Sequence, residues 1–232
     1  RIEERYQELN AKIGEPRIFQ NALTTYDSLN RKIRVQDQAF NIHYEYDANG
    51  NIIHMLANYR DAVNAAPKIQ DFWYSYDNMN RFTVSMGILN STTKKVERGN
   101  TGVALSYDVL GQRLSADYGK DALNSTKAHK ERYIYTTDGF LETIKNADYG
   151  TNGLLGTEYT LSSRHIDELG RVIKYEDYNE NSSSIYQTTK NTYNKDNQLI
   201  SQQKEGGSGA GTTVYSYLAD KVTLDKTVMT PN

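Results

Sequence analysis

The sequence contains no cysteine, which excludes disulfide bonds, thiolate nucleophiles and cysteine-ligated zinc sites. It has only three prolines and one tryptophan among 232 residues. No apolar run approaches the roughly 18–20 residues of a membrane-spanning helix, so we expect no membrane insertion. The 27 lysines and arginines are balanced by 29 acidic residues, so no overall positive field would gather nucleic acid. The chain begins at Arg1, without methionine or a signal-type segment, and we expect it to be part of a longer protein.

Tyrosine, by contrast, is abundant. There are 19 tyrosines against five phenylalanines, and aromatic residues make up 11% of the chain. Disordered chains are poor in aromatic residues, so a folded protein is expected. Tyrosine rings pack well on pleated, half-buried surfaces, and this composition therefore favours β-strands.

A tyrosine followed by a turn-forming sequence recurs along the chain at intervals of 20 to 31 residues. The clearest copies begin with the pairs Tyr26-Asp27, Tyr46-Asp47, Tyr76-Asp77 and Tyr107-Asp108. Weaker copies begin at Tyr135, Ile166, Tyr193 and Tyr217. We call the first residue of each copy its anchor. The recurrence indicates a repeat protein with about two strands in each repeat.

Each copy has a physical interpretation. The residue two positions before the anchor is often bulky and shares a strand face with it. The aspartate after the anchor is placed to cap a turn through its carboxylate. The fourth residue after the anchor is one that tolerates positive φ, namely Asn30, Gly50, Asn80, Gly111, Gly139, Gly170 or Asn197. The pattern predicts strand, tight turn and strand, and hence an all-β fold built as one long antiparallel sheet.

The repeats resemble the YD repeats of the Rhs family, with the motif Y-D-x-x-G-R-hydrophobic matched most fully at 46–52 and 107–114. The family includes bacterial Rhs polymorphic toxins, the B and C subunits of Tc toxins, wall-associated proteins and teneurins. The resemblance implies a spiral, solenoid-like sheet that encloses a C-terminal toxin cargo. It also implies secretion, or a place on a bacterial cell surface, and the rest of the parent protein as partner.

The sequence suggests three regions. Residues 1–19 form either a helix or a degenerate repeat, residues 20–222 form the repeat array, and residues 223–232 form a strand or tail. Apolar spacing from Leu56 to Ala66 predicts a short helix ended by Pro67. The polar stretch 90–102 is expected to be an exposed loop, and the glycine-rich stretch 205–211 a flexible connection.

We find no catalytic, metal or cofactor motif. The four histidines, His43, His54, His129 and His165, lack metal-ligand spacing, and the repeated aspartates sit where turn capping is expected. No GxSxG elbow is present, and no Asp-Pro pair matches the autoproteolytic segment of many Rhs shells. We therefore expect a structural protein rather than an enzyme, without a cofactor.

The aromatic residues Trp73 and Tyr74 allow a different interpretation. Exposed tryptophan and tyrosine rings stack on sugars, and a glycan-binding or adhesion array is the alternative function. Cross-strand aromatic pairing within the sheet accounts for the same residues without any ligand.

Overall fold

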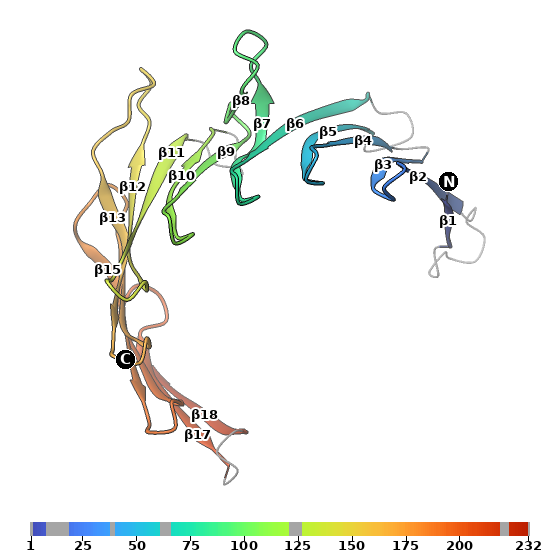
Figure 1. The fold of residues 1–232 in the computed structure, drawn as a ribbon. Helices are drawn as coiled ribbons and strands as arrows, with labels where there is room; N and C mark the ends of the chain where they lie inside the picture. Colours follow the sequence, from blue (N-terminus) through green and yellow to red (C-terminus); the bar gives the residue numbers. More distant parts are fainter. Residues whose placement is uncertain are drawn as a thin grey trace. The chain divides into compact units, whose positions relative to one another are not determined.

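A computed structural model describes residues 2–7, 19–37, 40–60, 66–120, 127–218 and 223–231. These residues form 18 β-strands, and no helix occurs among them (Figure 1). Every pair of strands whose register is known is antiparallel. The predicted all-β class and antiparallel pairing are confirmed.

The chain divides into two compact units. Unit 1 comprises residues 1–105 and 118–126, and unit 2 comprises residues 106–117 and 127–232. Unit 1 holds β1 (Ile2–Gln7), β2 (Phe19–Tyr26), β3 (Lys32–Gln36), β4 (Phe40–Tyr46), β5 (Ile52–Tyr59), β6 (Lys68–Tyr76), β7 (Phe82–Leu89), β8 (Val96–Glu97) and most of β9 (Val103–Tyr107). Strands β1 to β7 pair in chain order, and β7 also pairs with β8 and β9.

Unit 2 continues the same plan. It holds most of β10 (Arg113–Tyr118), then β11 (His129–Tyr135), β12 (Leu141–Asp148), β13 (Tyr159–Ile166), β14 (Val172–Tyr178), β15 (Ile185–Tyr193), β16 (Leu199–Gly206), β17 (Gly211–Tyr217) and β18 (Leu224–Pro231). Strands β11 to β18 pair consecutively. Each unit is therefore a meander of hairpins.

The repeats form one kind of hairpin. In the first, the Asn30 amide donates to the Asp27 carbonyl and the Asp27 amide donates to the Arg31 carbonyl, at 3.1 and 2.9 Å. The strand register shifts between Thr25 and the anchor Tyr26. This is a type I turn followed by a left-handed residue in a G1 bulge, whose twist suits an antiparallel pair.

The same register shift occurs at six more anchors, namely Tyr46, Tyr76, Tyr135, Ile166, Tyr193 and Tyr217. The sequence predicts the left-handed turn position but gives no direct sign of the bulge. Because the bulge occupies the same place each time, it keeps successive hairpins in equivalent registers.

Unit 1 has two chemically different faces. One carries apolar and aromatic side chains from neighbouring strands, since Tyr44, Met55 and Phe72 lie opposite one another in register. The other carries polar groups such as Glu45 and His54. Phe72 is 8% exposed and is one of the few buried apolar residues of the described chain.

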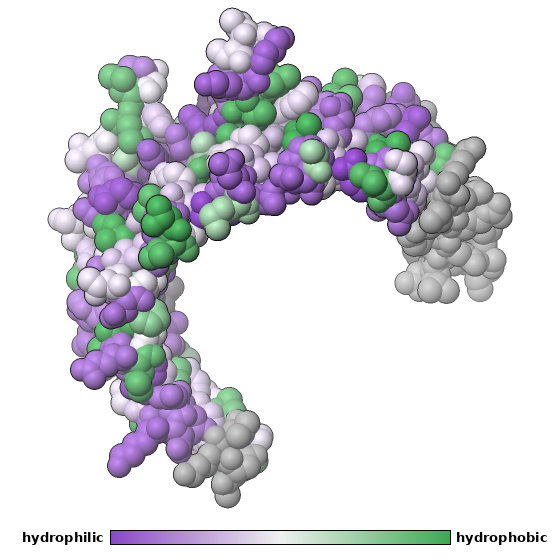
Figure 2. Space-filling model, viewed as in Figure 1, coloured by the Kyte–Doolittle hydropathy of each residue, from purple (hydrophilic) through white to green (hydrophobic). Residues whose placement is uncertain are grey.

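Unit 2 carries polar side chains on both faces, beside apolar pairs such as Tyr133 and Ile144. Adjacent positions across its sheet hold Tyr175, Thr189 and Lys204 on one face. On the other, Glu176 lies opposite Thr188 and is 6% exposed. No large side chain among the described residues is fully buried. Hydrophobic side chains form small groups between hydrophilic ones in Figure 2. The sheets are therefore stabilised by backbone pairing and local contacts more than by a thick core.

The helix predicted over 56–66 and the helical alternative for residues 1–19 are both wrong where the structure describes them. Ile2–Gln7 is strand β1, because its backbone pairs along its whole length with β2. Leu56 and Tyr59 lie in strand β5, which pairs with β4 and β6. Cross-strand hydrogen bonding outweighed the helical spacing of apolar residues in both segments. Residues 8–18 and 61–65 lie outside the described residues.

The predicted loop over residues 90–102 is also partly wrong, because Val96–Glu97 forms strand β8 against Ile88 and Leu89. Gly102 is buried, and its amide donates to the Arg98 carbonyl at 3.0 Å. The glycine-rich stretch contributes residues to β16 and β17 and turns between them, with positive φ at Gly206, Gly207 and Gly209. The C-terminal residues form β18.

Candidate functional site: the turn edge

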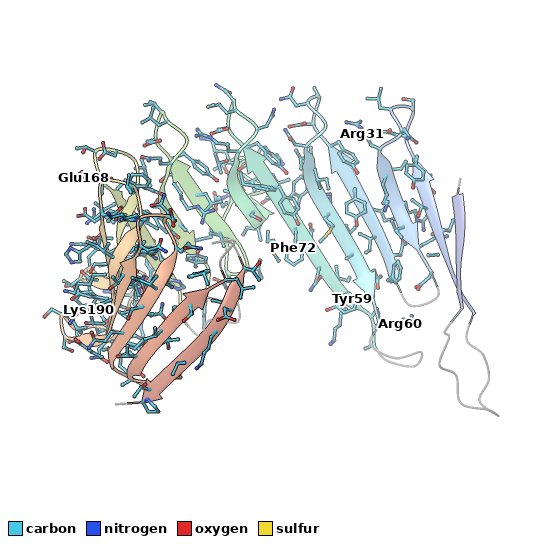
Figure 3. The ribbon with its side chains drawn as sticks, turned by 90° about the horizontal axis from the view of Figure 1, so that it is seen from below. Arg31, Tyr59, Arg60, Phe72, Glu168 and Lys190 are labelled. Atoms are coloured by element: carbon cyan, nitrogen blue, oxygen red, sulfur yellow. The ribbon has the colours of Figure 1, made fainter. Side chains whose placement is uncertain are left out.

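The repeated turns lie along one edge of each sheet, and we call this the turn edge. It consists of residues 27–31, 47–51 and 77–81 in unit 1, and 108–112, 136–140, 167–171 and 194–198 in unit 2. In Figure 3 Arg31 lies beside these turns, whereas Tyr59 lies at the other end of its strand. The turn of the last repeat, at residues 219–222, is outside the described residues.

The residue after the anchor caps the turn through its side chain. Asp77 Oδ1 accepts hydrogen bonds from the Met79 and Arg81 amides at 2.8 and 3.0 Å. The same pair of bonds is made by Asp27, Asp47, Asp108, Asp167 and Asn194. At residues 136–140, Thr136 Oγ1 accepts one bond, from Phe140. These side-chain oxygens satisfy main-chain donors that a tight turn otherwise leaves unpaired.

The hydrogen bonds also set the charge state of the aspartates. The backbone amide of Arg31 lowers the pKa of Asp27, and that of Arg81 lowers the pKa of Asp77. Side-chain hydrogen bonds from Asn51 and Arg171 lower the pKa of Asp47 and of Asp167. The ionised form is therefore favoured at these turns, as a cap requires.

In the seven described turns the fourth residue after the anchor has positive φ. The angles are 61° at Asn30, 88° at Gly50, 59° at Asn80, 91° at Gly111, 85° at Gly139, 79° at Gly170 and 63° at Asn197. A Cβ at Gly170 would lie 2.6 Å from Phe140 Cζ of the preceding turn, whereas a Cβ at Gly50 would meet open space. Gly170 therefore serves both backbone conformation and close packing.

Five of the anchor tyrosines link their repeat to the one before it. The Tyr46 hydroxyl donates to the Lys32 carbonyl at 2.6 Å, and the Tyr76 hydroxyl donates to the Ile52 carbonyl at 2.9 Å. The equivalent bonds in unit 2 run from Tyr135 to Arg113, from Tyr193 to Val172 and from Tyr217 to Leu199. Each acceptor begins the second strand of the preceding hairpin, six residues after its anchor, so the hydroxyl joins successive hairpins.

The fifth residue after the anchor makes a second link, to the following repeat. Arg31 Nε donates to its own Asp27 at 2.7 Å, while its guanidinium lies 4.6 Å from the centre of the Tyr46 ring and donates to the Asp47 carbonyl. Arg171 likewise covers the Tyr193 ring at 4.8 Å and donates to Asn197 Oδ1.

Asn51 and Gln112 reach the next turn by hydrogen bonds alone, to Asn80 Oδ1 and to the Gly139 carbonyl, both at 2.9 Å. Phe140 reaches it by packing against Gly170. Arginine, asparagine, glutamine and phenylalanine thus all contact the next turn from the same position of the repeat. The contact requires only a side chain long enough to span the distance to the neighbouring hairpin.

The repeat motif by itself does not reveal these links. The signal that could have revealed the hydroxyl bond is composition, since packing alone would be served equally by phenylalanine, yet tyrosine outnumbers it 19 to five. The anchor Ile166 has no hydroxyl and lacks this bond. The turn edge therefore consists of local contacts that join consecutive hairpins.

The two candidate sugar-stacking residues do not form one platform. Trp73 and Tyr74 are consecutive in strand β6 and point to opposite faces. The Trp73 ring stacks on His54 with the ring centres 4.0 Å apart. His54 also contacts Glu45 at 3.1 Å and Asp71 at 2.8 Å. The Tyr74 ring lies 6.0 Å from Phe82, and burial raises the pKa of Tyr74.

The remaining histidines are dispersed. His165 lies 3.7 Å from Glu176, and His129 Nδ1 lies 3.3 Å from the Lys127 carbonyl. Over the part of the chain that the structure describes, no group of three or more His, Cys, Asp or Glu side chains is arranged to hold a metal ion. That same part has no helix with the length and apolarity to cross a membrane.

Fold and turn edge together define a repeat array of antiparallel hairpins joined through tyrosine and turn contacts. No family model matches the sequence, and no curated protein matches it. Solved structures of Tc toxins are similar over most of the chain. The Photorhabdus luminescens Tc holotoxin pore, with a mutation in TccC3, aligns with 93% of this chain at 13% identity and a TM-score of 0.43.

Two structures of TcdB2–TccC3, one of them without the hypervariable C-terminal region, align with 91% of this chain at 12% identity and TM-scores of 0.32 and 0.30. The chain spans about 13–14% of the length of these solved chains. The likeness of this chain to YD repeats rests on its turn motifs, not on these superpositions.

Proposed function

We propose that this chain is a non-catalytic part of an Rhs-type shell that encloses a C-terminal toxin until it is delivered. The parent protein would be secreted or displayed by a bacterium, and its partners would be the remaining repeats and the toxin cargo. The observation that carries the proposal is the turn edge, where hydroxyl and arginine links join consecutive hairpins. A wall needs such neighbour-to-neighbour links more than it needs a thick hydrophobic core.

The arrangement of the repeated aspartates supports a structural role. Aspartates that act as acids or bases need an oxygen free to exchange a proton with a substrate. In Asp27, Asp77 and Asp167 one oxygen accepts two backbone amides and the other accepts an arginine Nε. Their carboxylates are therefore occupied in holding the turn.

The test is limited proteolysis with mass spectrometry on the full-length parent protein, in native buffer and in urea. Containment predicts that a C-terminal segment resists protease in native buffer and becomes sensitive at the urea concentration that unfolds the repeats. A downstream segment that is cut in native buffer as readily as in urea would overturn the proposal.

The alternative is a surface array that binds glycans, for which Trp73 is the candidate residue. Its ring is held in a fixed orientation by His54, and such pre-ordering favours stacking on a sugar. A glycan array probed with the chain and with Trp73→Ala tests this alternative. Binding that disappears in the variant would favour it, whereas containment predicts no glycan ligand for either protein.

A further inference from the structure

A polar pocket of about 500 Å³ lies in unit 2, near the ends of the strands that are opposite to the turn edge. Lys145 in β12 and Thr160 in β13 form one side of it. Thr157 and Glu158 come from the segment before β13, and Asn181, Ser182 and Ser183 come from the connection between β14 and β15. Positive φ at Asn181, 54°, bends this connection beside the pocket.

The charges of the pocket are unequal. Both oxygens of Glu158 accept hydrogen bonds from Arg132, at 2.8 and 2.6 Å. These bonds, together with the nearby positive charges of Lys145 and Lys130, lower the pKa of Glu158. The carboxylate is thus ionised and already neutralised by Arg132. The ammonium group of Lys145 lies near the same carboxylate but makes no hydrogen bond or ion pair with it, so two cationic side chains, Arg132 and Lys145, share one anionic partner.

Five lining side chains make no hydrogen bond to another described residue: the half-buried Lys145 and Thr160, and the solvent-exposed Thr157, Asn181 and Ser183. Other lysines on the same face differ, since Lys174 pairs with Glu176 at 2.5 Å and Lys190 pairs with Glu205 at 2.7 Å. An ammonium group only donates, whereas hydroxyl and amide groups both donate and accept. The free groups therefore suit a ligand with anionic oxygens at one end and hydroxyl groups elsewhere.

We propose that this pocket binds a small polyhydroxylated carboxylate, with the carboxylate at Lys145 and the hydroxyl groups against Thr157, Asn181 and Ser183. A neutral polyol leaves the ammonium unpaired, and a simple carboxylate leaves the hydroxyl and amide groups to water. The inference is independent of the proposed shell role, which makes no use of this pocket.

The test uses isothermal titration of the intact chain with D-gluconate, D-glucose and acetate as probes. Gluconate is expected to bind saturably, and at least about tenfold more tightly than either of the other two. Glucose lacks the carboxylate that would form a charge-assisted hydrogen bond with Lys145, and acetate lacks the hydroxyl groups that would contact Thr157, Asn181 and Ser183. Lys145→Gln is expected to weaken gluconate binding about tenfold. The matched control Lys190→Gln removes a lysine that pairs outside the pocket and is expected to leave binding unchanged.

A further variant, Asn181→Gly, keeps the positive φ and removes the amide, and it is expected to weaken binding about threefold. The absence of saturable gluconate binding would overturn the proposal, as would equal binding by Lys145→Gln. Acetate that binds as tightly as gluconate would overturn the ligand class. Far-UV circular dichroism shows whether Lys145→Gln folds. If it does not, the proposal is tested on the unaltered chain, where glucose that binds as tightly as gluconate would overturn it.

Discussion

The two units share their turns and differ in their faces. Both use an aspartate or asparagine cap, a left-handed fourth residue and a tyrosine hydroxyl bonded to the preceding hairpin. The strand faces of unit 1 place Tyr44, Met55 and Phe72 in register. Strands β14 to β16 of unit 2 place Tyr175, Thr189 and Lys204 in register instead.

The buried carboxylate of Glu176 in unit 2 is held by polar contacts. Glu176 accepts hydrogen bonds from Ser163 at 3.1 Å and pairs with Lys174 at 2.5 Å. The hydrogen bond from Lys174 lowers the pKa of Glu176. The comparison teaches that the hairpin is specified by its turn, while the strand faces are free to be apolar or polar. Four predictions test this separation.

The largest effect is expected from Phe72→Ala in unit 1. The side chain is 8% exposed, and its removal should lower the free energy of unfolding by about 3 kcal/mol. This value is at the low end for a phenylalanine, because the sheet lacks a second layer. Thr189→Ala, at an equally buried position of unit 2, should cost less than about 1 kcal/mol. Urea unfolding followed by the fluorescence of Trp73, the single tryptophan, reports on unit 1, and circular dichroism reports on the whole chain. Equal costs would contradict the difference between faces.

Valine at the left-handed positions should lower the free energy of unfolding by less than the loss of the buried Phe72 ring does. Gly50→Val in unit 1 is expected to cost about 1–2 kcal/mol, because a β-branched residue disfavours positive φ. Gly170→Val in unit 2 should cost about 1 kcal/mol more, since its Cβ also displaces Phe140. Thermal melts of both variants provide the measurement. A Gly50→Val protein as stable as the unaltered chain would refute the turn assignment.

Removal of single anchor hydroxyls should have smaller effects. Tyr193→Phe deletes a partly buried hydrogen bond to the Val172 carbonyl and should cost about 1 kcal/mol. Tyr46→Phe deletes an exposed one and should cost about 0.5 kcal/mol. Chemical denaturation of both variants measures these costs. If both variants are as stable as the unaltered chain, the hydroxyl does not contribute to linking the repeats.

The smallest effect concerns pH. The folded-state pKa values of Asp27, Asp47 and Asp77 are lowered, so their stabilising contribution is present above the unfolded value near 3.8 and is lost as pH falls through the folded values. Protection of the Met79 amide against hydrogen exchange, corrected for intrinsic rates, should fall in that range. The Asp196 amide is bonded to Asn194, which does not titrate, and provides the matched control. Equal losses at both amides would contradict the capping role of the carboxylate.

Much of the turn edge could be predicted from the sequence. The spacing of tyrosine, aspartate and glycine or asparagine correctly placed the left-handed residue of every described repeat turn, because few residue types tolerate that conformation. The helix predicted at 56–66 and the helical alternative at the N-terminus were wrong over the described residues. Apolar spacing at short range does not distinguish a helix from a strand that pairs on both sides.

The sequence by itself determined the hairpins, because a tight turn depends on residues adjacent in the chain and on their local backbone preferences. Only the tertiary structure decided which hydroxyl meets which carbonyl, as in Tyr76 and Ile52, and which fifth residue reaches the next turn. It also placed Lys145 beside Asn181 and Ser183. Such contacts join residues about 20 to 40 positions apart, and their geometry follows from strand register and bulges rather than from local preference.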